Sequence, residues 1–432
     1  MTLPSKSLPN LRWWICTLLF ASTIINYIDR QTLSLLAPDL KRVYHWTNSD
    51  YAVLVIAFRV AYAIGQTSFG RLLDRVGTKR GLLGTVAFYS VISILTSLAN
   101  GFRSFISFRF LLGLAESGNW PGATKAVAEW FPKRERGLAT AFFDSGSSIG
   151  GAIAPFIVLY VYAHLGLHAT FVIPGLLGFI WLGAWRRFYY LPQDHPLISA
   201  GEKQMISADR PMELENPDRP KWSDLLKFPQ TWGAIVARSF TDPVWFFIAD
   251  WFPIYLVSKG IPLAGSLISV WIPFVATDLG NFAGGAASGY LIARGWPLGR
   301  ARKAVAVFGG IGVLAIIPTV LTTSLLAITS LFGIATFCYG CFTTIANVLP
   351  SDLFQRHSVA SVSGLGGTAA SIGTIAAFIL IGRLTDSRAA TGTHSFDPIM
   401  IVAGLIPFIG MILVLLLVRN TAATDEGLVE RI

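Results

Sequence analysis

Long apolar runs separated by short polar segments make up nearly the whole chain. About twelve of these runs reach the roughly 20 residues that an α-helix needs to cross a bilayer. The first six predicted spans lie near 13–37, 50–73, 81–100, 103–126, 137–163 and 168–190. The second six lie near 231–257, 264–292, 303–322, 325–349, 358–384 and 396–418. The pattern predicts an all-α integral membrane protein with twelve transmembrane helices.

One long polar connection, 191–230, divides these spans into two sets of six. It is rich in proline and in charges of both signs, so we expect a hinge loop there. The predicted domains are a six-helix bundle at 1–190, a cytoplasmic hinge at 191–230, and a second bundle at 231–432 that ends in a short cytoplasmic tail. Residues 148–156 resemble residues 371–378, which favours two parallel repeats facing a site at the midplane.

Composition and charge agree with a membrane protein. Hydrophobic residues make up 53% of the chain and charged residues 13%, too few to cover a soluble globule of this size. The formal net charge of +10 comes from basic residues between the apolar runs, which is the positive-inside pattern of cytoplasmic loops. We therefore expect the lipid bilayer as partner, no nucleic acid and both termini in the cytoplasm.

Several function classes lack their motifs. The sequence has no G-x-x-x-x-G-K-[ST] phosphate loop, no His/Cys/Asp cluster with metal-ligand spacing and no evident catalytic serine elbow. Cys16, Cys338 and Cys341 all lie in apolar runs, as small packing residues do. We expect no metal, no cofactor and no enzymatic activity.

Among the ionisable residues inside predicted spans, four fall in two short motifs of the first and fourth spans: Asp29, Arg30, Arg109 and Glu116. A charge at the bilayer centre costs about 2.5–3.5 kcal/mol on insertion scales, so such residues usually face a partner or a watery cavity and act there. Arg109 and Glu116 are two helical turns apart, about 10 Å, and cannot neutralise each other side by side. Asp29 and Arg30 point about 100° apart around their helix, so one can face a neighbouring helix and the other a cavity.

A glycine-rich segment joins the second and third spans, and it reads Gly-Arg-Leu-Leu-Asp-Arg-Val-Gly-Thr-Lys-Arg from Gly70. It resembles the loop signature of the major facilitator superfamily, which implies a cytoplasmic gate motif formed by Gly70, Asp74, Arg75 and Gly77. Asp74 can accept hydrogen bonds from a helix N-terminus or from a nearby arginine. Ala293 occupies the aspartate position in the second repeat, so any latch there must differ.

Further motifs narrow the resemblance. Asn26-Tyr-Ile-Asp-Arg30, Arg109 to Glu116, Glu129-Trp-Phe-Pro132 and Ser145-Gly-Ser-Ser-Ile-Gly150 together resemble the anion:cation symporter family of that superfamily. The seventh and eighth spans, around Arg238-Ser-Phe-Thr-Asp242 and Trp271-Ile-Pro-Phe-Val-Ala-Thr-Asp278, are most similar to its hexuronate carriers.

Charge and resemblance together suggest a proton switch. Burial raises the pKa of a carboxyl group and a nearby arginine lowers it, so a carboxyl whose arginine leaves when substrate binds can take up a proton. We predict Asp29 and Glu116 as proton carriers, and the resemblance implies the same roles. Arg109 is their predicted tuning partner. The alternative is a static ion-pair network that locks the first span to the fourth.

Arginine suits carboxylate recognition because its planar fork offers two parallel donors and stays charged. Arg30 and Arg238, one from each half, are predicted to grip the substrate's acid group, although Arg238 could instead snorkel to the surface. A sugar ring also needs aromatic and polar contacts, each of which could instead be an interhelical hydrogen bond. The candidates are Tyr27, Tyr62, Ser147, Asn281 and Asn347.

The predicted function is proton-coupled import of a small carboxylated sugar by a monomer with alternating access. The resemblance implies that this sugar is a hexuronate, such as glucuronate or galacturonate, and that the location is a bacterial inner (plasma) membrane. Other organic anions such as an aldonate or dicarboxylate, sodium coupling, and a non-transporting sensor of the same fold are the alternatives. Ser147 stands where an aldonate-carrying relative has glutamine, which disfavours an aldonate. No role is assigned to the acids Asp144, Asp242, Asp250 and Asp278.

Overall fold

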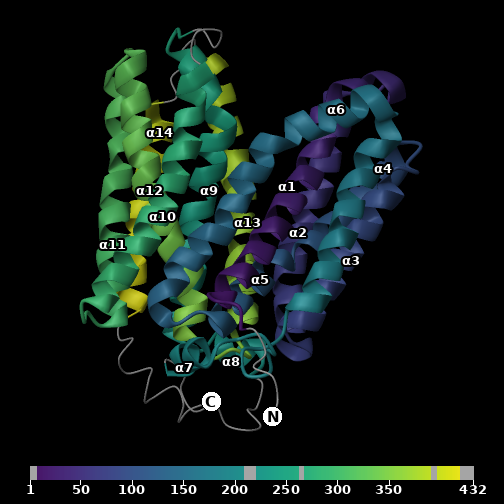
Figure 1. Cartoon of the computed structure of the whole chain (residues 1–432). Coiled ribbons are helices and arrows are strands. Elements are labelled where there is room, and N and C mark those ends of the chain that lie inside the picture. Colours follow the sequence, from purple (N-terminus) through teal and green to yellow (C-terminus); the bar gives the residue numbers. More distant parts are fainter. Residues whose placement is uncertain (1–6, 209–219, 262–266, 391–396, 419–432) are drawn as a thin grey trace. The chain divides into compact units, whose positions relative to one another are not determined.

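The computed structural model describes residues 7–208, 220–261, 267–390 and 397–418, and within these ranges every regular element is helical. The first half contains α1 (Leu11–Tyr44), α2 (Asn48–Val76), α3 (Thr78–Thr96), α4 (Phe102–Glu116), α5 (Asn119–Trp130) and α6 (Lys133–Phe188). The predicted hinge contains α7 (Ala200–Ala208) and α8 (Trp222–Leu225). The second half contains α9 (Pro229–Ser258), α10 (Leu267–Ala293), α11 (Leu298–Gly312), the 3-10 helix η2 (Val313–Leu321), α12 (Leu325–Leu353), α13 (Val359–Ala390) and α14 (Asp397–Leu417) (Figure 1).

These helices correspond to the predicted spans if two pairs of short helices are each counted as one span and one long helix is counted as two. α4 with α5 covers the fourth span, and α11 with η2 covers the ninth. Gly166 divides the 56-residue α6 into two arms because its φ of 79° lies in the left-handed region that favours glycine. Seven of the described helices are long and apolar enough to cross a membrane by length and composition alone. The all-α, twelve-helix prediction is confirmed.

The fourth span is distorted next to Glu116 rather than broken. Ser117 and Gly118 keep right-handed helical dihedral angles between α4 and α5. Pro121 explains the distortion, because it has no N–H for the carbonyl group of Ser117 four residues earlier, and its ring pushes against that carbonyl. The prediction of one continuous fourth span therefore lacked a local irregularity that lies directly beside a candidate proton carrier.

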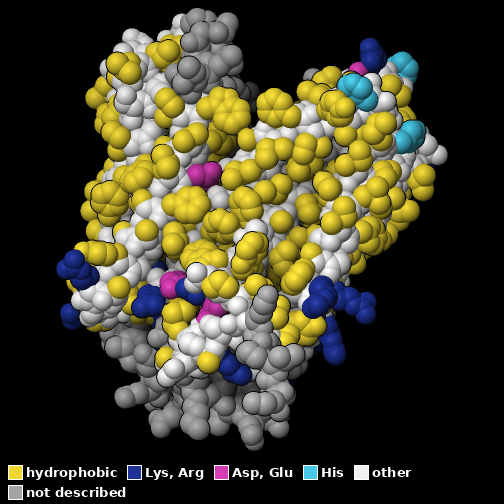
Figure 2. Space-filling model, in the orientation of Figure 1, with side chains coloured by type: hydrophobic (Ala, Val, Ile, Leu, Met, Phe, Trp, Pro, Cys, Tyr) yellow, Lys and Arg dark blue, Asp and Glu magenta, His cyan; other side chains and the backbone are white. Residues whose placement is uncertain are grey.

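Apolar side chains dominate the outer surface along the helices. Phe156 is 78% exposed and Ile180 is 71% exposed, values typical of side chains that face lipid rather than water. Figure 2 shows hydrophobic side chains over most of the visible face, with lysine and arginine gathered near helix ends. The described chain is therefore that of a multi-pass membrane protein.

The chain forms two compact units. One comprises Met1–Pro132, Phe142–Arg219 and Phe354–Thr368, and the other comprises Lys133–Ala141, Pro220–Leu353 and Ala369–Ile432. The two units differ from the predicted bundles at 1–190 and 231–432 in two places, where the start of a helix from one bundle belongs to the unit formed by the other. The first turns of α6 belong to the second unit, and the first turns of α13 belong to the first unit.

A residue of the hinge caps the start of α1. Asn10 has left-handed dihedral angles, and its side chain makes no capping bond. Glu202 of α7 takes its place: its carboxylate oxygens accept from the backbone N–H of Leu11 at 3.0 Å and of Arg12 at 3.1 Å. The Arg12 guanidinium also donates to Glu202 at 2.8 Å. A carboxylate at this end satisfies orphan N–H groups and complements the helix dipole.

Replacing Glu202 with alanine should therefore destabilise the protein by about 1–2 kcal/mol, the usual cost of losing an N-cap. The free energy of denaturant-induced unfolding in detergent micelles measures this cost. Gln204→Ala is the matched control, because Gln204 is an exposed neighbour on the same helix. Equal unfolding midpoints for both variants would show that the Glu202 cap is energetically unimportant.

Candidate functional site

The first unit contains a buried ion pair between α1 and α4. Arg30 donates from Nε and Nη2 to the same carboxylate oxygen of Glu116, at 3.1 and 3.0 Å. Nη2 also donates to the side-chain oxygen of Asn26 at 3.0 Å, one turn earlier on α1. The Glu116 side chain is fully buried whereas that of Arg30 is 22% exposed. The arginine is therefore the member of the pair that an incoming ligand can reach.

Three aromatic rings surround the Arg30 guanidinium. Its central carbon lies 4.9 Å from the ring centroid of Tyr27, 5.2 Å from that of Phe58 and 4.8 Å from that of Tyr62. Rings at this range attract a cation through their faces. Tyr27 also interacts with Ser147 of α6, so three of the predicted substrate contacts lie beside the predicted clamp. Phe58 is a member of this group that the sequence analysis missed.

The other two intramembrane charges lie beside this pair. Asp29 is 3% exposed and accepts from the Ser93 hydroxyl of α3 at 2.8 Å, while its second oxygen has no hydrogen-bond partner among the described residues. Arg109 is 5% exposed, and its guanidinium lies 4.7 Å from the Phe58 centroid. Asp29 and Arg30 thus face different neighbouring helices, as their angular separation allows.

This geometry changes the relation between the two arginines. The sequence analysis named Arg109 as the partner of the carboxyl groups and Arg30 as the substrate clamp. In the structure, the arginine that contacts Glu116 directly is Arg30. The guanidinium predicted to bind the substrate's acid group is therefore the one that binds a carboxylate of the protein.

The candidate residues of the second unit are engaged in contacts of their own. Arg238 is 8% exposed and donates to Asp242, one turn later on α9, at 2.7 Å. It is thus a buried, paired cation, which differs from the alternative of a side chain snorkelling to the surface. The acid of this pair, Asp242, had no assigned role.

Two predicted polar contacts lie on α10 and α12 in the second unit. Asn281 accepts from the Thr344 hydroxyl at 3.0 Å, which is an interhelical hydrogen bond. Asn347 is 7% exposed and lies about one turn further along α12. Asp144 and Asp278 are half-buried, and the side chain of Asp250 lies outside the described residues.

The glycine-rich segment between α2 and α3 holds a second buried ion pair. Asp74 accepts from Lys125 of α5 at 2.7 Å, with both side chains at most 4% exposed. Asp74 also accepts from the backbone N–H of Ser361 at 2.7 Å and of Ala360 at 3.3 Å, in the first turn of α13. Lys125 donates in addition to the carbonyl of Arg356 at 2.6 Å. The N-terminus of a helix, here α13, is one of the two partners predicted for Asp74, because an acid is favourable at that end of the helix dipole.

Close packing explains the glycines of this segment. The Gly70 backbone lies so close to the Ala360 carbonyl that a Cβ would collide with it. Gly77 joins α2 directly to α3 with a φ of 84°. Arg75 is exposed, unlike the buried Asp74 beside it.

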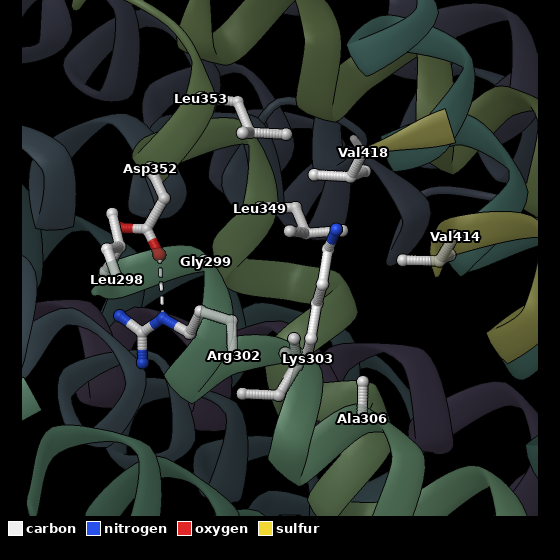
Figure 3. A pocket seen from close by; sticks show the side chains of 11 residues that line it. Leu298, Gly299, Arg302, Lys303, Ala306, Leu349, Asp352, Leu353, Val414 and Val418 are labelled. Carbon is white, nitrogen blue, oxygen red and sulfur yellow. Dashed lines mark hydrogen bonds and ion pairs between the residues drawn. The ribbon is translucent and has the colours of Figure 1, made fainter. Parts of the chain in front are cut away.

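The second unit has a different network near the end of α10, where Ala293 replaces the acid. Asp352 of α12 accepts from Arg302 Nε at 2.8 Å and forms an ion pair with Arg136 of α6 at 3.5 Å. Arg302 also donates to Ser288 at 2.5 Å and to the carbonyl of Lys133, where α6 begins, at 2.8 Å. Figure 3 shows Arg302 and Asp352 facing each other at the edge of a small cavity. The acid of this network is therefore Asp352 on α12 rather than a residue at position 293.

Lys125 is the largest omission of the sequence analysis. It lies at the end of the fourth predicted span, where a lysine can snorkel to the surface, so its burial against Asp74 was not evident from the sequence alone. Among the described residues, no group of three or more His, Cys, Asp or Glu side chains could hold a metal ion.

Membrane-length helices with buried charges inside them are features of secondary transporters. The chain belongs to the Major Facilitator Superfamily, whose family model matches residues 19–378. The prediction of a transporter of this superfamily, rather than an enzyme, is confirmed.

The relatives narrow this description. The chain is 28% identical over 428 residues to the hexuronate transporter of Escherichia coli K12, with 97% of each protein covered. It is 30% identical over 278 residues to the galacturonate transporter of Dickeya chrysanthemi, which covers 64% of this chain and 81% of that protein. The solved structure of the proton:xylose symporter XylE superimposes with a TM-score of 0.70 at 13% identity, covering 93% of this chain and 94% of that one. That likeness shows the shared fold.

Proposed function

We propose that the protein imports a hexuronate, such as glucuronate or galacturonate, together with protons. The observation that carries this proposal is the ion pair between Arg30 and Glu116, in which the arginine is accessible and the carboxylate is fully buried. The two relatives named for hexuronate and galacturonate transport support the substrate class.

A substrate carboxylate can replace the Glu116 carboxylate on Arg30. Both anions fit the same planar guanidinium fork, and one fork binds one carboxylate side-on. Glu116 would then be left at 0% exposure without its cation, and an unpaired charge at that depth is costly. A proton neutralises the displaced carboxylate, so binding of substrate and binding of a proton are linked.

Asp29 is the proposed second carrier. It is buried and accepts a hydrogen bond from Ser93, and its other oxygen has no hydrogen-bond partner among the described residues, so a proton there would displace none of them. One proton per monoanion would be electroneutral and would use only the pH gradient. A second proton would add the membrane potential, worth about 2.3 kcal/mol per charge per 100 mV.

The sugar itself would be held by the aromatic and polar groups beside the clamp. Tyr27 and Tyr62 offer ring faces and hydroxyls, and Ser147 adds a further hydroxyl. Arg238, Asn281 and Asn347 are further proposed substrate contacts. The protein would work as a monomer in the bacterial inner membrane, with both termini in the cytoplasm and gate segments around Asp74 and Asp352.

Uptake of labelled glucuronate into proteoliposomes tests this proposal. With an acidic outside, we expect accumulation that a protonophore abolishes and that excess unlabelled glucuronate or galacturonate inhibits. Gluconate, galactarate and sodium gradients are the comparison conditions. If no hexuronate competes, the substrate is wrong. If uptake ignores the protonophore, the proton coupling is wrong.

A further inference from the structure

An open cavity lies where α2 turns into α3, apart from the ion pairs described above. It contains about 970 Å³ of empty space, part of it open to solvent, and its lining combines two arginines with apolar side chains and glycines. Arg75 and Arg80 are both exposed there. Thr85 adds a hydroxyl group to the lining, no carboxylate is among its described residues, and its two charged groups are both cationic.

The frame of this cavity is fixed by packing. The turn at Gly77 needs a positive φ and places Arg75 and Arg80 on either side of it. Thr78 is buried directly after the turn and donates to Glu129 at 2.7 Å. The remaining basic residue of the turn is directed elsewhere, because the Lys79 ammonium lies 3.5 Å from the centroid of Tyr190. The well-packed turn at Gly77 therefore keeps both arginines at the cavity.

The apolar residues of the lining are exposed at the surface of the helices. Leu72 is 45% exposed and Val76 is 41% exposed on the last turns of α2. A Cβ built at Gly84 of α3 would meet no atom within 4 Å, so the space beside it is open. A ligand that fills the whole cavity must therefore present both negative charge and hydrocarbon.

We propose that this cavity binds the headgroup of an anionic phospholipid, with its acyl chains lying along Leu72 and Val76. Guanidinium groups bind phosphate oxygens through parallel N–H donors. Basic pockets between transmembrane helices are suited to such headgroups, since the chains of the lipid stay in the bilayer. A free phosphate ion would use the arginines but leave the exposed apolar wall uncovered.

Lipid binding to the purified full-length protein in detergent tests the site. The probes are phosphatidylglycerol and cardiolipin, with phosphatidylcholine as the zwitterionic comparison, and native mass spectrometry reports the bound lipid. We expect Arg75→Gln/Arg80→Gln to weaken binding of the anionic lipids at least about tenfold. Gly84→Leu should weaken it as well, because it fills the cavity without changing any charge, and it keeps the test valid if the double variant fails to fold.

The matched control is Arg186→Gln/Arg187→Gln, which removes two exposed arginines near the end of α6, outside the cavity. Retained binding in this control supports the site, whereas an equal loss would overturn it in favour of general electrostatic attraction. Equal binding of phosphatidylcholine would also overturn it. Displacement of the lipid by millimolar inorganic phosphate would show a phosphate site in place of a lipid site.

Discussion

Replacing Glu116 with glutamine should abolish uphill accumulation of substrate while leaving exchange of substrate across the membrane intact. Glutamine keeps the size of the side chain and can still accept from Arg30, but it cannot carry a proton. With one proton per monoanion, a gradient of one pH unit supports about tenfold accumulation, because one pH unit corresponds to about 1.36 kcal/mol. We expect this ratio to fall to about one in the variant, measured in proteoliposomes without a membrane potential.

Three companion variants sharpen this experiment. Asp39→Asn, a half-exposed acid near the far end of the same α1 helix, should leave accumulation unchanged. Asp29→Asn should lower the accumulation ratio only if Asp29 carries a second proton. Arg30→Lys should lose both accumulation and exchange, because lysine lacks the bidentate fork. Normal accumulation by Glu116→Gln would support the static ion-pair network instead.

Replacing Lys125 with methionine should lower the stability of the protein by about 3–5 kcal/mol, the usual cost of leaving one member of a buried ion pair without its partner. Asp74 would keep its backbone donors in α13 but lose the ammonium group at 2.7 Å. Unfolding in detergent micelles measures the loss. A double-mutant cycle with Asp74→Asn isolates the interaction between the two side chains.

An exposed pair of the same kind provides the control for this cycle. Lys227 contacts Asp224 at 2.9 Å, but both side chains are largely exposed to solvent. Breaking that pair should leave the unfolding midpoint unchanged. Additive effects of Lys125→Met and Asp74→Asn would mean that the two buried side chains do not stabilise each other.

The fold could be predicted well from the sequence because membrane spans are encoded locally. A run of about 20 apolar residues must be helical, since lipid offers no partner for free backbone groups. The distortion beside Glu116 was missed, although Pro121 inside the fourth span could have indicated it. Ala293, at the aspartate position of the second repeat, also indicated that the ion-pair networks of the two repeats differ.

The contacts between charges could not be predicted in the same way. Arg30 and Glu116 are 86 positions apart, and their pairing depends on how α1 packs against α4. Asp74 reaches α13, 287 positions later, and Glu202 reaches back 191 positions to α1. Sequence chemistry identified most participants, but only the packing of the helices shows which charge neutralises which. The transport roles of these residues stay predictions.

The exchange of helix starts between the two units constrains how the chain folds during synthesis. The unit that begins at the N-terminus includes Phe354–Thr368, so it stays incomplete until most of the chain has been made. Until then, Asp74 and Lys125 lack their backbone partners at Ser361 and Arg356. A fragment that ends in the hinge would therefore carry an unfinished polar surface, and we expect it to depend on the second half, supplied in the same cell, for its own stability.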